Sequence, residues 1–535
     1  MMKKQNTIPI LIGVSGHRDL RPGDREALYG AVKGELEKLR ALCPSSPLAL
    51  LCSLAEGADQ LCARAARELG IPITAVLPMA MEDYLEDFSP QGAEELRAFC
   101  AGAERVLTAP FTEAEPAGGA DRDFRYRQAG IYIAERCHVL LALWDGRPGP
   151  ASACGTAAAV GFSLEGKYWP ADRVSLRSGA NAGVLHILTP RGEDRAEGAG
   201  EVRRLGDWAA VETILRRTED YNRQARDLGP ASWRILPEHG PGDGTLDRME
   251  EAALGADSLS LRNAGKYRRV LALLALASTL LTLAFLFYDE AEAIWLILVC
   301  GLLLVFAWLC RVWARRSDCH RRFIEYRALA ECLRVQACLR YAGSGLRAAT
   351  LLSWSQQEET AWIMAALCAL DTGEEPGERH DILACWVEDQ LHYHEKAARR
   401  TGRAAKLSDR VVGTALCLSI LLYLAGLAFE LLWGGRILRP LLPAADPELC
   451  RTVLKIAMGG ISAATLFISN YYGRLSLPRV LADHRKMARF YGKMAEQLRQ
   501  RGQTETLLRV LAREELAENG NWVSYQSDNT PDISL

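Results

Sequence analysis

The chain has 535 residues, enough for two or three domains of ordinary size. Lysine and arginine (64 residues) nearly balance aspartate and glutamate (66 residues), so the net charge of -2 provides no global positive field and predicts no nucleic-acid partner. The fifteen cysteines form no CxxC pair and no zinc-type spacing, which indicates reduced thiols and no metal site.

Short apolar runs alternate with helix-like stretches in the first half of the chain. The runs are Ile8–Val14, Leu48–Ser53, Ile73–Leu77, Arg105–Thr108, His138–Leu143 and Val184–Leu188. Continuous runs of this length are typical of parallel strands buried on both faces, and stretches such as 24–42 and 58–69 supply crossover helices. We therefore predict a doubly wound α/β domain over residues 1–250. Residues 193–224 are charged, and we expect them to be helical.

Three loops of this domain follow predicted strands and lead into predicted helices, where ligands bind in parallel sheets. The first is GVSGHRD, in which glycines permit a tight turn, the next helix offers free N–H groups to an anion, and the arginine can clamp a phosphate. A plain structural turn explains the glycines equally well, and a loop histidine more often packs than binds. The candidate ligand contacts are Gly13, Ser15, Gly16, His17 and Arg18.

The second and third loops add hydrogen-bonding groups at the same edge. SLAEGAD supplies Ser53 and Glu56 for a sugar or base, and Gly57 for close backbone approach. Asp59 completes this set, although a carboxylate in the first turn of a helix has a purely structural explanation. The third loop runs from Trp144 to Thr156. Its candidate contacts are Asp145, Gly155 and Thr156, with the last two expected to cradle phosphate.

Several strings of the first half resemble one known family. GVSGHRDL, SLAEGAD, YRQAGIYIAERC and LALWDG with a later Gly-Thr are similar to SLOG domains, which are related to DNA-processing protein A and LOG proteins. The resemblance spans residues 8–240 and implies a nucleotide or nucleotide-derived ligand, with cleavage of N-glycosidic bonds in some members. LOG-type hydrolases use PGGxGTxxE with a catalytic glutamate. Ala159 occupies that position here, which favours sensing over hydrolysis.

Four apolar segments of the second half are each near the length that crosses hydrocarbon as a helix. They are Val270–Tyr288, Ala293–Cys310, Val411–Phe429 and Ile456–Tyr472. The fourth is the least apolar because it contains two glycines and several polar side chains. The alternative is a set of buried helices in a soluble domain. We predict two membrane-spanning hairpins in an all-α region, dividing the chain into domains 1–250, 251–400 and 401–535.

Basic residues flank both ends of each pair of segments. The flanking residues are Lys266, Arg268 and Arg269, then Arg311, Arg315, Arg316, Arg321 and Arg322, then Arg399, Arg400, Arg403, Lys406 and Arg410, and finally Arg474, Arg479, Arg485 and Lys486. Such residues are retained in the cytoplasm, although the second outer loop is also basic. We therefore predict a multi-pass protein of a bacterial inner membrane, with the α/β domain and the C-terminus cytoplasmic.

A string of the form Y-x-x-[LM]-A-E-x-L-R follows each pair of segments. It runs from Tyr326 to Arg334 and again from Tyr491 to Arg499, which favours a repeated unit over generic amphipathic helices. Two spanning helices followed by this string resemble SLATT effector domains over residues 255–525. That family is predicted to form membrane pores in bacterial conflict systems. The candidate coupling residues are Tyr326, Glu331, Arg334, Tyr491, Glu496 and Arg499.

Two classes of function follow from these patterns and resemblances. In the first, the chain is a membrane effector of an anti-phage system that senses a nucleotide second messenger and disrupts the bilayer. In the second, it is a membrane-tethered nucleotide N-glycosidase or phosphoribohydrolase; Ala159 favours the first. We expect a homo-oligomer, no cofactor, and a signal-producing nucleotide cyclase or TIR-domain protein in the same system. Plain transport lacks support, because no ionisable residue lies well inside a spanning segment.

Overall fold

The computed structural model divides the chain into two compact units. It describes residues 6–148, 154–165, 183–191, 198–229, 234–237, 244–291, 294–373, 379–434, 446–475 and 477–528. The first unit contains Met1–Leu259, Glu325–Asp381 and Glu505–Val523, and the second contains Ser260–Ile324, Ile382–Thr504 and Ser524–Leu535. Each unit collects separate stretches of sequence, so the units do not follow a sequential division at residues 250 and 400.

A seven-stranded sheet forms the centre of the first unit. Its strands are β1 (Ile10–Gly16), β2 (Leu48–Cys52), β3 (Ile73–Leu77), β4 (Arg105–Thr108), β5 (Val139–Trp144), β6 (Gly183–Leu188) and β7 (Val202–Gly206). The order is β4-β3-β2-β1-β5-β6-β7, and all neighbours are parallel except β6 and β7. The predicted sheet of parallel strands in an α/β domain is confirmed.

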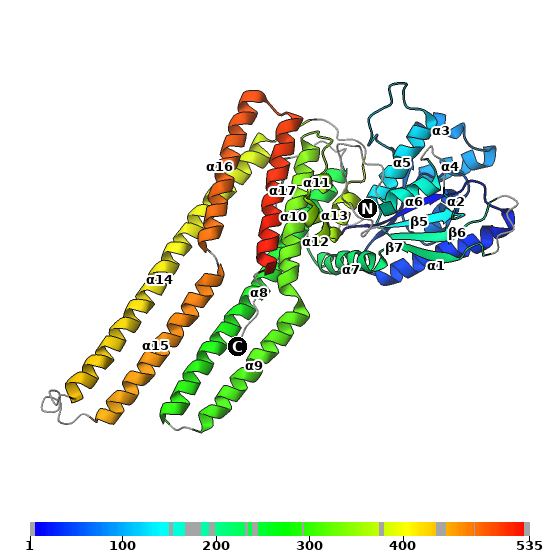
Figure 1. Ribbon diagram of the computed structural model, residues 1–535. Coiled ribbons are helices and arrows are strands. Elements are labelled where there is room, and N and C mark those ends of the chain that lie inside the picture. Colours follow the sequence, from blue (N-terminus) through cyan, green and yellow to red (C-terminus); the bar gives the residue numbers. More distant parts are fainter. Residues whose placement is uncertain are drawn as a thin grey trace. The chain divides into compact units, whose positions relative to one another are not determined.

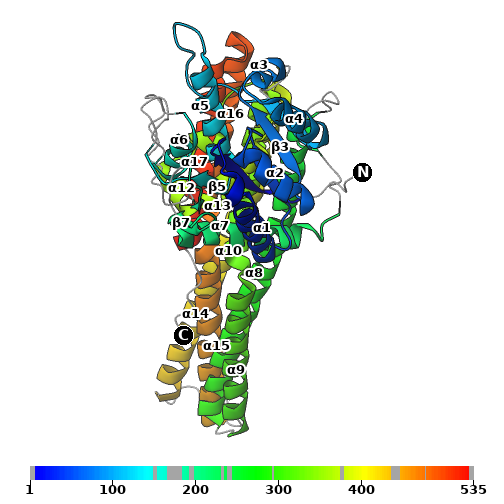
Figure 2. The same ribbon diagram turned by 90° about the vertical axis from the view of Figure 1, so that its right-hand side faces the viewer.

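Helices cover both faces of the sheet because its buried strands are apolar on both sides. Alternate residues of β5 point to opposite faces, so Leu141 packs in one core and Leu140 in the other. One layer contains α1 (Arg25–Leu42), α2 (Ala58–Glu68) and α7 (Trp208–Ala225), and the other contains α5 (Arg122–Arg136) and α6 (Thr156–Glu165). Figure 2 shows α1 and α2 on the opposite side of the sheet from α5 and α6. The remaining elements here are the 3-10 turn Pro22–Asp24, α3 (Met81–Leu85) and α4 (Pro90–Gly102).

Two sequence predictions for this domain are wrong. Residues 202–206, expected to be helical, form edge strand β7, where Arg203 and Arg204 have side chains 54% and 55% exposed. An edge strand with solvated side chains carries no continuous apolar run. The first loop does not begin at Gly13, because β1 continues to Gly16. A Cβ at Gly13 would lie 2.8 Å from Ile133 Cγ2, so this glycine lets α5 pack closely on the strand.

Helices from later in the chain complete the first unit. They are α10 (Cys319–Tyr341), α11 (Ala348–Leu351), α12 (Trp354–Glu359), α13 (Ala361–Leu370) and α17 (Glu505–Asp528). The start of α10, up to Ile324, and the end of α17, beyond Val523, belong to the second unit. Asn519 of α17 donates to the carbonyl of Ala328 (3.2 Å), and Ser344 donates to Glu505 (2.7 Å). The last helix is therefore held to α10 and the segment after it by buried polar contacts.

Long helices make up the second unit. They are most of α8 (Gly244–Ala291), α9 (Trp295–Ser317), a π-helical turn (Leu383–Glu388), α14 (Asp389–Gly434), α15 (Pro447–Leu475) and α16 (Leu477–Arg501). In Figures 1 and 2, α8 runs beside α9 and α14 runs beside α15.

Three described helical stretches are long and apolar enough to cross a membrane: Gly244–Asp289, Trp295–Tyr341 and Leu383–Leu432. Only 11%, 0% and 6% of the residues in their most apolar windows are buried, so these helices present apolar surface that needs a nonaqueous environment. Membrane-crossing helices are thus supported. The predicted fourth span lies in α15, which is not among these three stretches, and the outer loop at 435–445 lies outside the described residues.

Helix α15 places its small and hydroxyl side chains against neighbouring helices. A Cβ at Gly459 would lie 2.8 Å from Leu286 of α8, so these two helices approach closely. Two hydroxyl pairs join α15 to α14, Ser419 with Thr465 (3.1 Å) and Tyr423 with Ser462 (3.3 Å). Its polar character is therefore used in helix packing, as is common for helices in lipid.

Candidate functional site

Strands β2, β3 and β4 extend the sheet on one side of β1, and β5, β6 and β7 extend it on the other. The strand order therefore reverses between β1 and β5. In open α/β sheets, ligands bind beyond the carboxyl ends of the strands at such a reversal. The loops after β1 and β5 meet at this point. We call this edge, formed by residues 16–20, 53–59 and 144–147, the switch-point edge.

The loop after β1 is tied to β5 and to α2 through backbone contacts. The His17 N–H donates to the Leu143 carbonyl (3.1 Å), and the His17 carbonyl accepts from the Ala58 N–H (3.0 Å). A Cβ at Gly16 would lie 2.3 Å from Ala58 Cβ, so only glycine permits this approach. His17 and Arg18 thus lie in the loop where the sequence places them, whereas Gly13, Ser15 and Gly16 belong to β1, which ends at Gly16.

His17 and Asp145 lie together at the switch-point edge. The Asp145 N–H donates to His17 Nε2 (3.1 Å), and a carboxylate oxygen of Asp145 lies 3.4 Å from the same nitrogen. Burial lowers the pKa of His17, with a further contribution from nearby Arg191. A neutral imidazole that accepts at Nε2 carries its proton on Nδ1. The pair therefore offers an N–H donor and a carboxylate acceptor to a polar ligand.

Arg18 lies between two aromatic rings. Its guanidinium carbon is 5.6 Å from the centre of Phe88 and 5.1 Å from that of Tyr126, and Nη2 donates to the Tyr126 hydroxyl (2.7 Å). Nη1 donates to the carbonyl of Asp87 (3.3 Å), a longer contact. Because Arg18 is exposed yet held by these groups, it presents a fixed positive charge at the edge.

A polar cluster beside Arg18 was not predicted from the sequence. The Tyr126 hydroxyl donates to the Asp87 carboxylate, and Arg122 Nη1 lies 2.8 Å from the same oxygen. Tyr126 begins the YRQAG string, which was noted only as part of the family resemblance. Its role was missed because Asp87, just after α3, and Tyr126, in α5, are 39 residues apart in the sequence and meet only in the fold.

Gly57 and Asp59 of the second loop hold the backbone of that loop in place. Gly57 has φ of +92°, and a Cβ there would lie 2.2 Å from the carbonyl oxygen of Arg18, so the first two loops are in direct contact. Asp59 is only 4% exposed and accepts from the Ala55 N–H (3.3 Å). Burial raises the pKa of Asp59 to about 7. Asp59 therefore holds the loop from within, and the Ser53 carbonyl accepts from buried Tyr84 (3.2 Å).

The carboxylate of Glu56 accepts hydrogen bonds from Ser89 at the start of α4. Ser89 donates its hydroxyl to Oε1 (2.6 Å) and its N–H to Oε2 (3.1 Å), and the Ser89 oxygen accepts from the Gly92 N–H (3.1 Å). The hydrogen bonds from the Ser89 side chain and backbone lower the pKa of Glu56. Glu56 thus joins the second loop to the N-terminus of α4, a favourable place for a carboxylate.

The third loop follows β5 and reaches the same end of the sheet. Gly155 has φ of +94°, and Thr156 begins α6 with a side chain that is buried. Residues 149–153 lie outside the described residues. Within the described part, no hydrogen bond joins Gly155 or Thr156 to the first two loops. The third loop therefore meets the first through Asp145 and His17 at its start, but not through Gly155 and Thr156 at its end.

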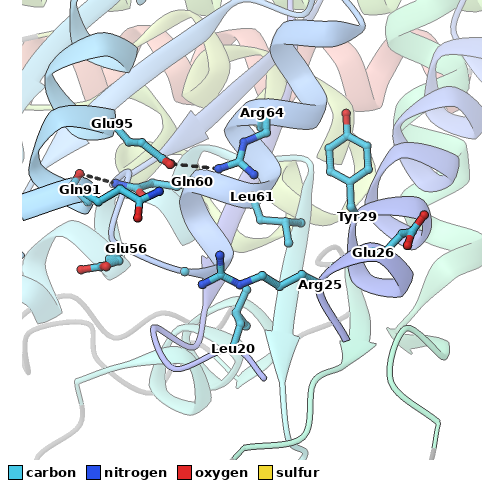
Figure 3. Close-up of a pocket in the computed structure, with 12 residues that line it drawn as sticks. Leu20, Arg25, Glu26, Tyr29, Glu56, Gln60, Leu61, Arg64, Gln91 and Glu95 are labelled. Atoms are coloured by element: carbon cyan, nitrogen blue, oxygen red, sulfur yellow. Dashed lines mark hydrogen bonds and ion pairs between the residues drawn. The ribbon is translucent and has the colours of Figure 1, made fainter. Parts of the chain in front are cut away.

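A groove of about 340 Å³ lies between α1, α2 and α4. Figure 3 shows Arg64 pointing to Glu95, with which it forms an ion pair of 3.0 Å. The charged lining side chains are Arg25, Arg64, Glu26, Glu56 and Glu95. Because acidic groups outnumber basic ones, the groove gives no preference for an anion. Of the sequence-predicted residues only Glu56 and Gly57 line it, and the convergent donors lie at the switch-point edge instead.

The first copy of the repeated string contacts the sheet domain. Tyr326 accepts from Gln224 of α7 (2.7 Å), and its ring lies 5.4 Å from that of Tyr221. Glu331 and Arg334 form an ion pair, and Arg334 also pairs with Glu515 of α17. These residues therefore connect α7, α10 and α17 within the first unit.

The second copy has different partners within the second unit. Tyr491 of α16 stacks on His394 of α14, with ring centres 5.6 Å apart. Arg499 pairs with Glu388, and Glu496 accepts from Gln500 (3.1 Å). The shared string thus occupies two different environments, with only the first copy belonging to the unit that contains the sheet.

The switch-point edge brings together three polar side chains, those of His17, Arg18 and Asp145. Ala159, at the position of the LOG-type glutamate, lies in the first turns of α6 and is packed in the core with 3% of its surface exposed. Among the described residues there is no group of three or more histidine, cysteine or acidic side chains that could hold a metal ion.

No protein-family model matches this chain, and no curated protein matches it either.

Proposed function

We propose that this protein is a ligand-gated membrane effector that senses a nucleotide-derived signal at the switch-point edge. The observation that carries the proposal is the make-up of the first unit. It joins the sheet to residues 325–381, which lie between the two predicted hairpins, and to residues 505–523, which follow the second. A ligand bound at the sheet can therefore act on segments that are continuous with membrane helices.

The make-up of the first unit also supports α15 as a fourth span. A chain returns to the same side of a membrane only after an even number of crossings. Because α14 is apolar enough to cross, α15 must bring the chain back if residues 505–523 are to join the unit. Its contacts with α8 and α14 explain why it needs fewer apolar side chains. We infer two complete hairpins, with the first unit cytoplasmic because of the basic flanks.

Cysteine accessibility tests this topology. Cys450 precedes α15's apolar stretch and is expected on the outer side, whereas Ser355 is exposed in the first unit. We expect a membrane-impermeant maleimide to label Cys450 in intact cells, and to label Ser355→Cys, made in a Cys450→Ser background, only after the membrane is permeabilised. Cys450→Ser is the matched control that removes the outer signal. Labelling of Ser355→Cys in intact cells would contradict the topology.

The ligand class rests on the fold and the chemistry of the edge. A parallel sheet whose order reverses next to His17, Arg18 and Asp145 suits a ligand with anionic and hydroxyl groups. The SLOG resemblance supports a nucleotide-derived second messenger as the ligand, and the SLATT resemblance supports a role in anti-phage defence at a bacterial inner membrane. We propose that several copies assemble to disrupt the bilayer, and that a cyclase or TIR-domain enzyme makes the signal.

Liposome leakage tests the proposed function. ADP-ribose and cyclic dinucleotides, as representative nucleotide-derived probes, are expected to bind the purified protein and release a trapped dye. Arg18→Ala should weaken binding by tenfold or more, because a charged hydrogen bond is worth about 1.5–3 kcal/mol. Calorimetry measures the binding.

Arg64→Ala is the control, since Arg64 lies in the groove between α1, α2 and α4 and already pairs with Glu95. A larger loss of binding in Arg64→Ala than in Arg18→Ala would move the ligand to that groove. Release of a free base without any leakage would instead establish the tethered hydrolase.

A further inference from the structure

Helix α5 contacts the switch-point edge with its first turns and a buried ion-pair cluster with its last turn. At the first end, Tyr126 accepts from Arg18 (2.7 Å). At the other end, Glu135 and Arg136 enter the cluster. Ten residues separate Tyr126 from Arg136, which corresponds to roughly 15 Å along a helix.

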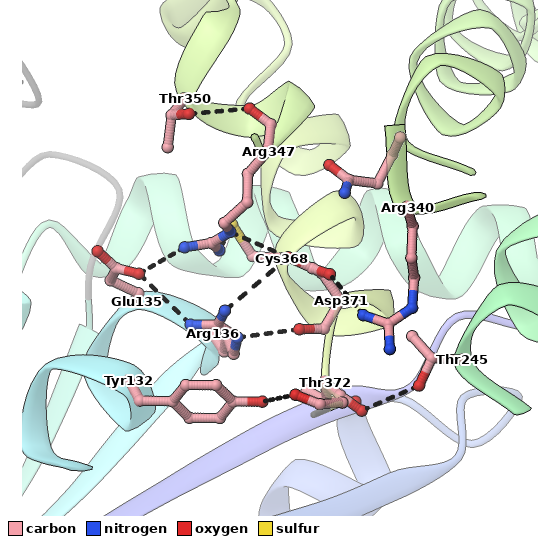
Figure 4. Close-up of polar contacts among 12 residues, drawn as sticks. Tyr132, Glu135, Arg136, Thr245, Arg340, Arg347, Thr350, Cys368, Asp371 and Thr372 are labelled. Atoms are coloured by element: carbon pink, nitrogen blue, oxygen red, sulfur yellow. Dashed lines mark hydrogen bonds and ion pairs between the residues drawn. The ribbon is translucent and has the colours of Figure 1, made fainter. Parts of the chain in front are cut away.

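The cluster joins α5 to the start of α11 and the end of α13. Arg347 bridges two carboxylates, with Nη1 2.5 Å from Glu135 Oε2 and Nε 3.0 Å from Asp371 Oδ2. Arg136 donates through Nε to the carbonyl of Asp371 (2.9 Å). Figure 4 shows these side chains converging from α5 and from the segment that carries Arg347 and Asp371. Their side chains are only 4–12% exposed, so water replaces none of these contacts easily.

Helix α5 is held firmly between its two ends. Gln128 is fully buried and accepts from the Thr112 N–H (2.7 Å). The Arg136 guanidinium lies 3.7 Å from the centre of the Tyr132 ring, and the Tyr132 hydroxyl donates to the Gly373 carbonyl (3.3 Å). A helix packed in this way moves as one body, so a displacement at Tyr126 reaches the cluster.

The cluster responds steeply to such a displacement. A buried ion pair offsets its desolvation cost only with good geometry. Oε1 of Glu135 is buried and has no hydrogen-bond partner within the described part of the chain, so the carboxylate depends on the contacts of Oε2. A small shift of α5 therefore changes the free energy of the cluster considerably.

We propose that α5 transmits the state of the switch-point edge to residues 347–373 through Glu135 and Arg136. In the sequence, residues 347–373 lie between the two predicted hairpins. The regulatory meaning of this path rests on the proposed sensing function. The physical connection can be measured without ligand or leakage, so failure of one proposal is distinguishable from failure of the other.

Hydrogen exchange of the full-length protein in detergent tests the connection. Tyr126→Phe removes the hydroxyl that joins Arg18 and Asp87. We expect amide exchange in residues 361–373 to become about tenfold faster. Tyr84→Phe is the matched control, because Tyr84 also loses a buried hydroxyl at this edge but lies on α3 and not on α5. It should leave residues 361–373 within twofold of the unchanged protein.

A second variant interrupts the path at its far end. In a Glu135→Gln background, adding Tyr126→Phe should change exchange in residues 361–373 by less than twofold. Amides of β2 report general unfolding in every variant. The proposal is overturned if Tyr126→Phe accelerates β2 equally, if Tyr84→Phe has the same effect as Tyr126→Phe, or if Glu135→Gln leaves the effect of Tyr126→Phe intact.

Discussion

Replacing Arg347 with alanine is expected to lower the free energy of unfolding of the first unit by about 3–5 kcal/mol. The change removes the nearest cation from the carboxylates of Glu135 and Asp371, whose side chains are 4% and 11% exposed, and leaves them the longer contacts of Arg136 at 3.4 and 3.8 Å. Urea unfolding of the purified full chain in detergent, followed by tryptophan fluorescence, measures the loss.

An exposed ion pair of the same domain provides the control. Arg203 of β7 pairs with Glu201 (3.0 Å), and both side chains are more than half exposed. Arg203→Ala should cost about 0–1 kcal/mol, because water screens such pairs. Equal losses in Arg347→Ala and Arg203→Ala would show that the buried cluster does not stabilise the fold.

Gly57→Ala is expected to cost about 2–6 kcal/mol and to abolish binding at the switch-point edge. The backbone at Gly57 has φ of +92° and ψ of -114°, a region that side chains strain by about 1–3 kcal/mol. The new Cβ would also lie 2.2 Å from the Arg18 carbonyl oxygen, which adds an overpacking cost of about 1–3 kcal/mol. The first two loops must then separate. Thermal unfolding and calorimetry with ADP-ribose measure the two effects.

Gly70 separates the two contributions. It also has positive φ, +65°, but a Cβ there would meet no atom within 4 Å. Gly70→Ala should therefore cost only the left-handed penalty of about 1–2 kcal/mol and leave binding unchanged. If Gly57→Ala is no more destabilising than Gly70→Ala, the two loops do not approach as closely as described.

The parallel strands were predictable because burial on both faces leaves a continuous apolar run. The run at His138–Leu143 became β5 with a shift of one residue at each end. Strand β7 was missed because Arg203 and Arg204 point to solvent at the edge of the sheet. Gly13 was assigned to a loop because a glycine required by packing against Ile133 looks the same in sequence as one required by a turn.

Contacts at the candidate site were less predictable. His17 and Asp145 are 128 residues apart, and their meeting depends on the strand order, which short motifs do not specify. Glu56 was interpreted as a ligand contact, but it accepts hydrogen bonds from Ser89, and this pairing depends on how α4 packs against α2. Arg347 and Glu135, separated by 212 residues, offered no local signal at all.

The discontinuous make-up of the first unit also has a consequence for biosynthesis. Protein synthesis proceeds from the N-terminus, so residues 505–523 emerge only after α8, α9, α14 and α15 have been made. Until then Arg334 lacks Glu515, and the Ala328 carbonyl lacks Asn519. A nascent chain therefore cannot finish its first unit before its hydrophobic helices have left the ribosome. Completion of the first unit is thereby delayed until membrane insertion can take place.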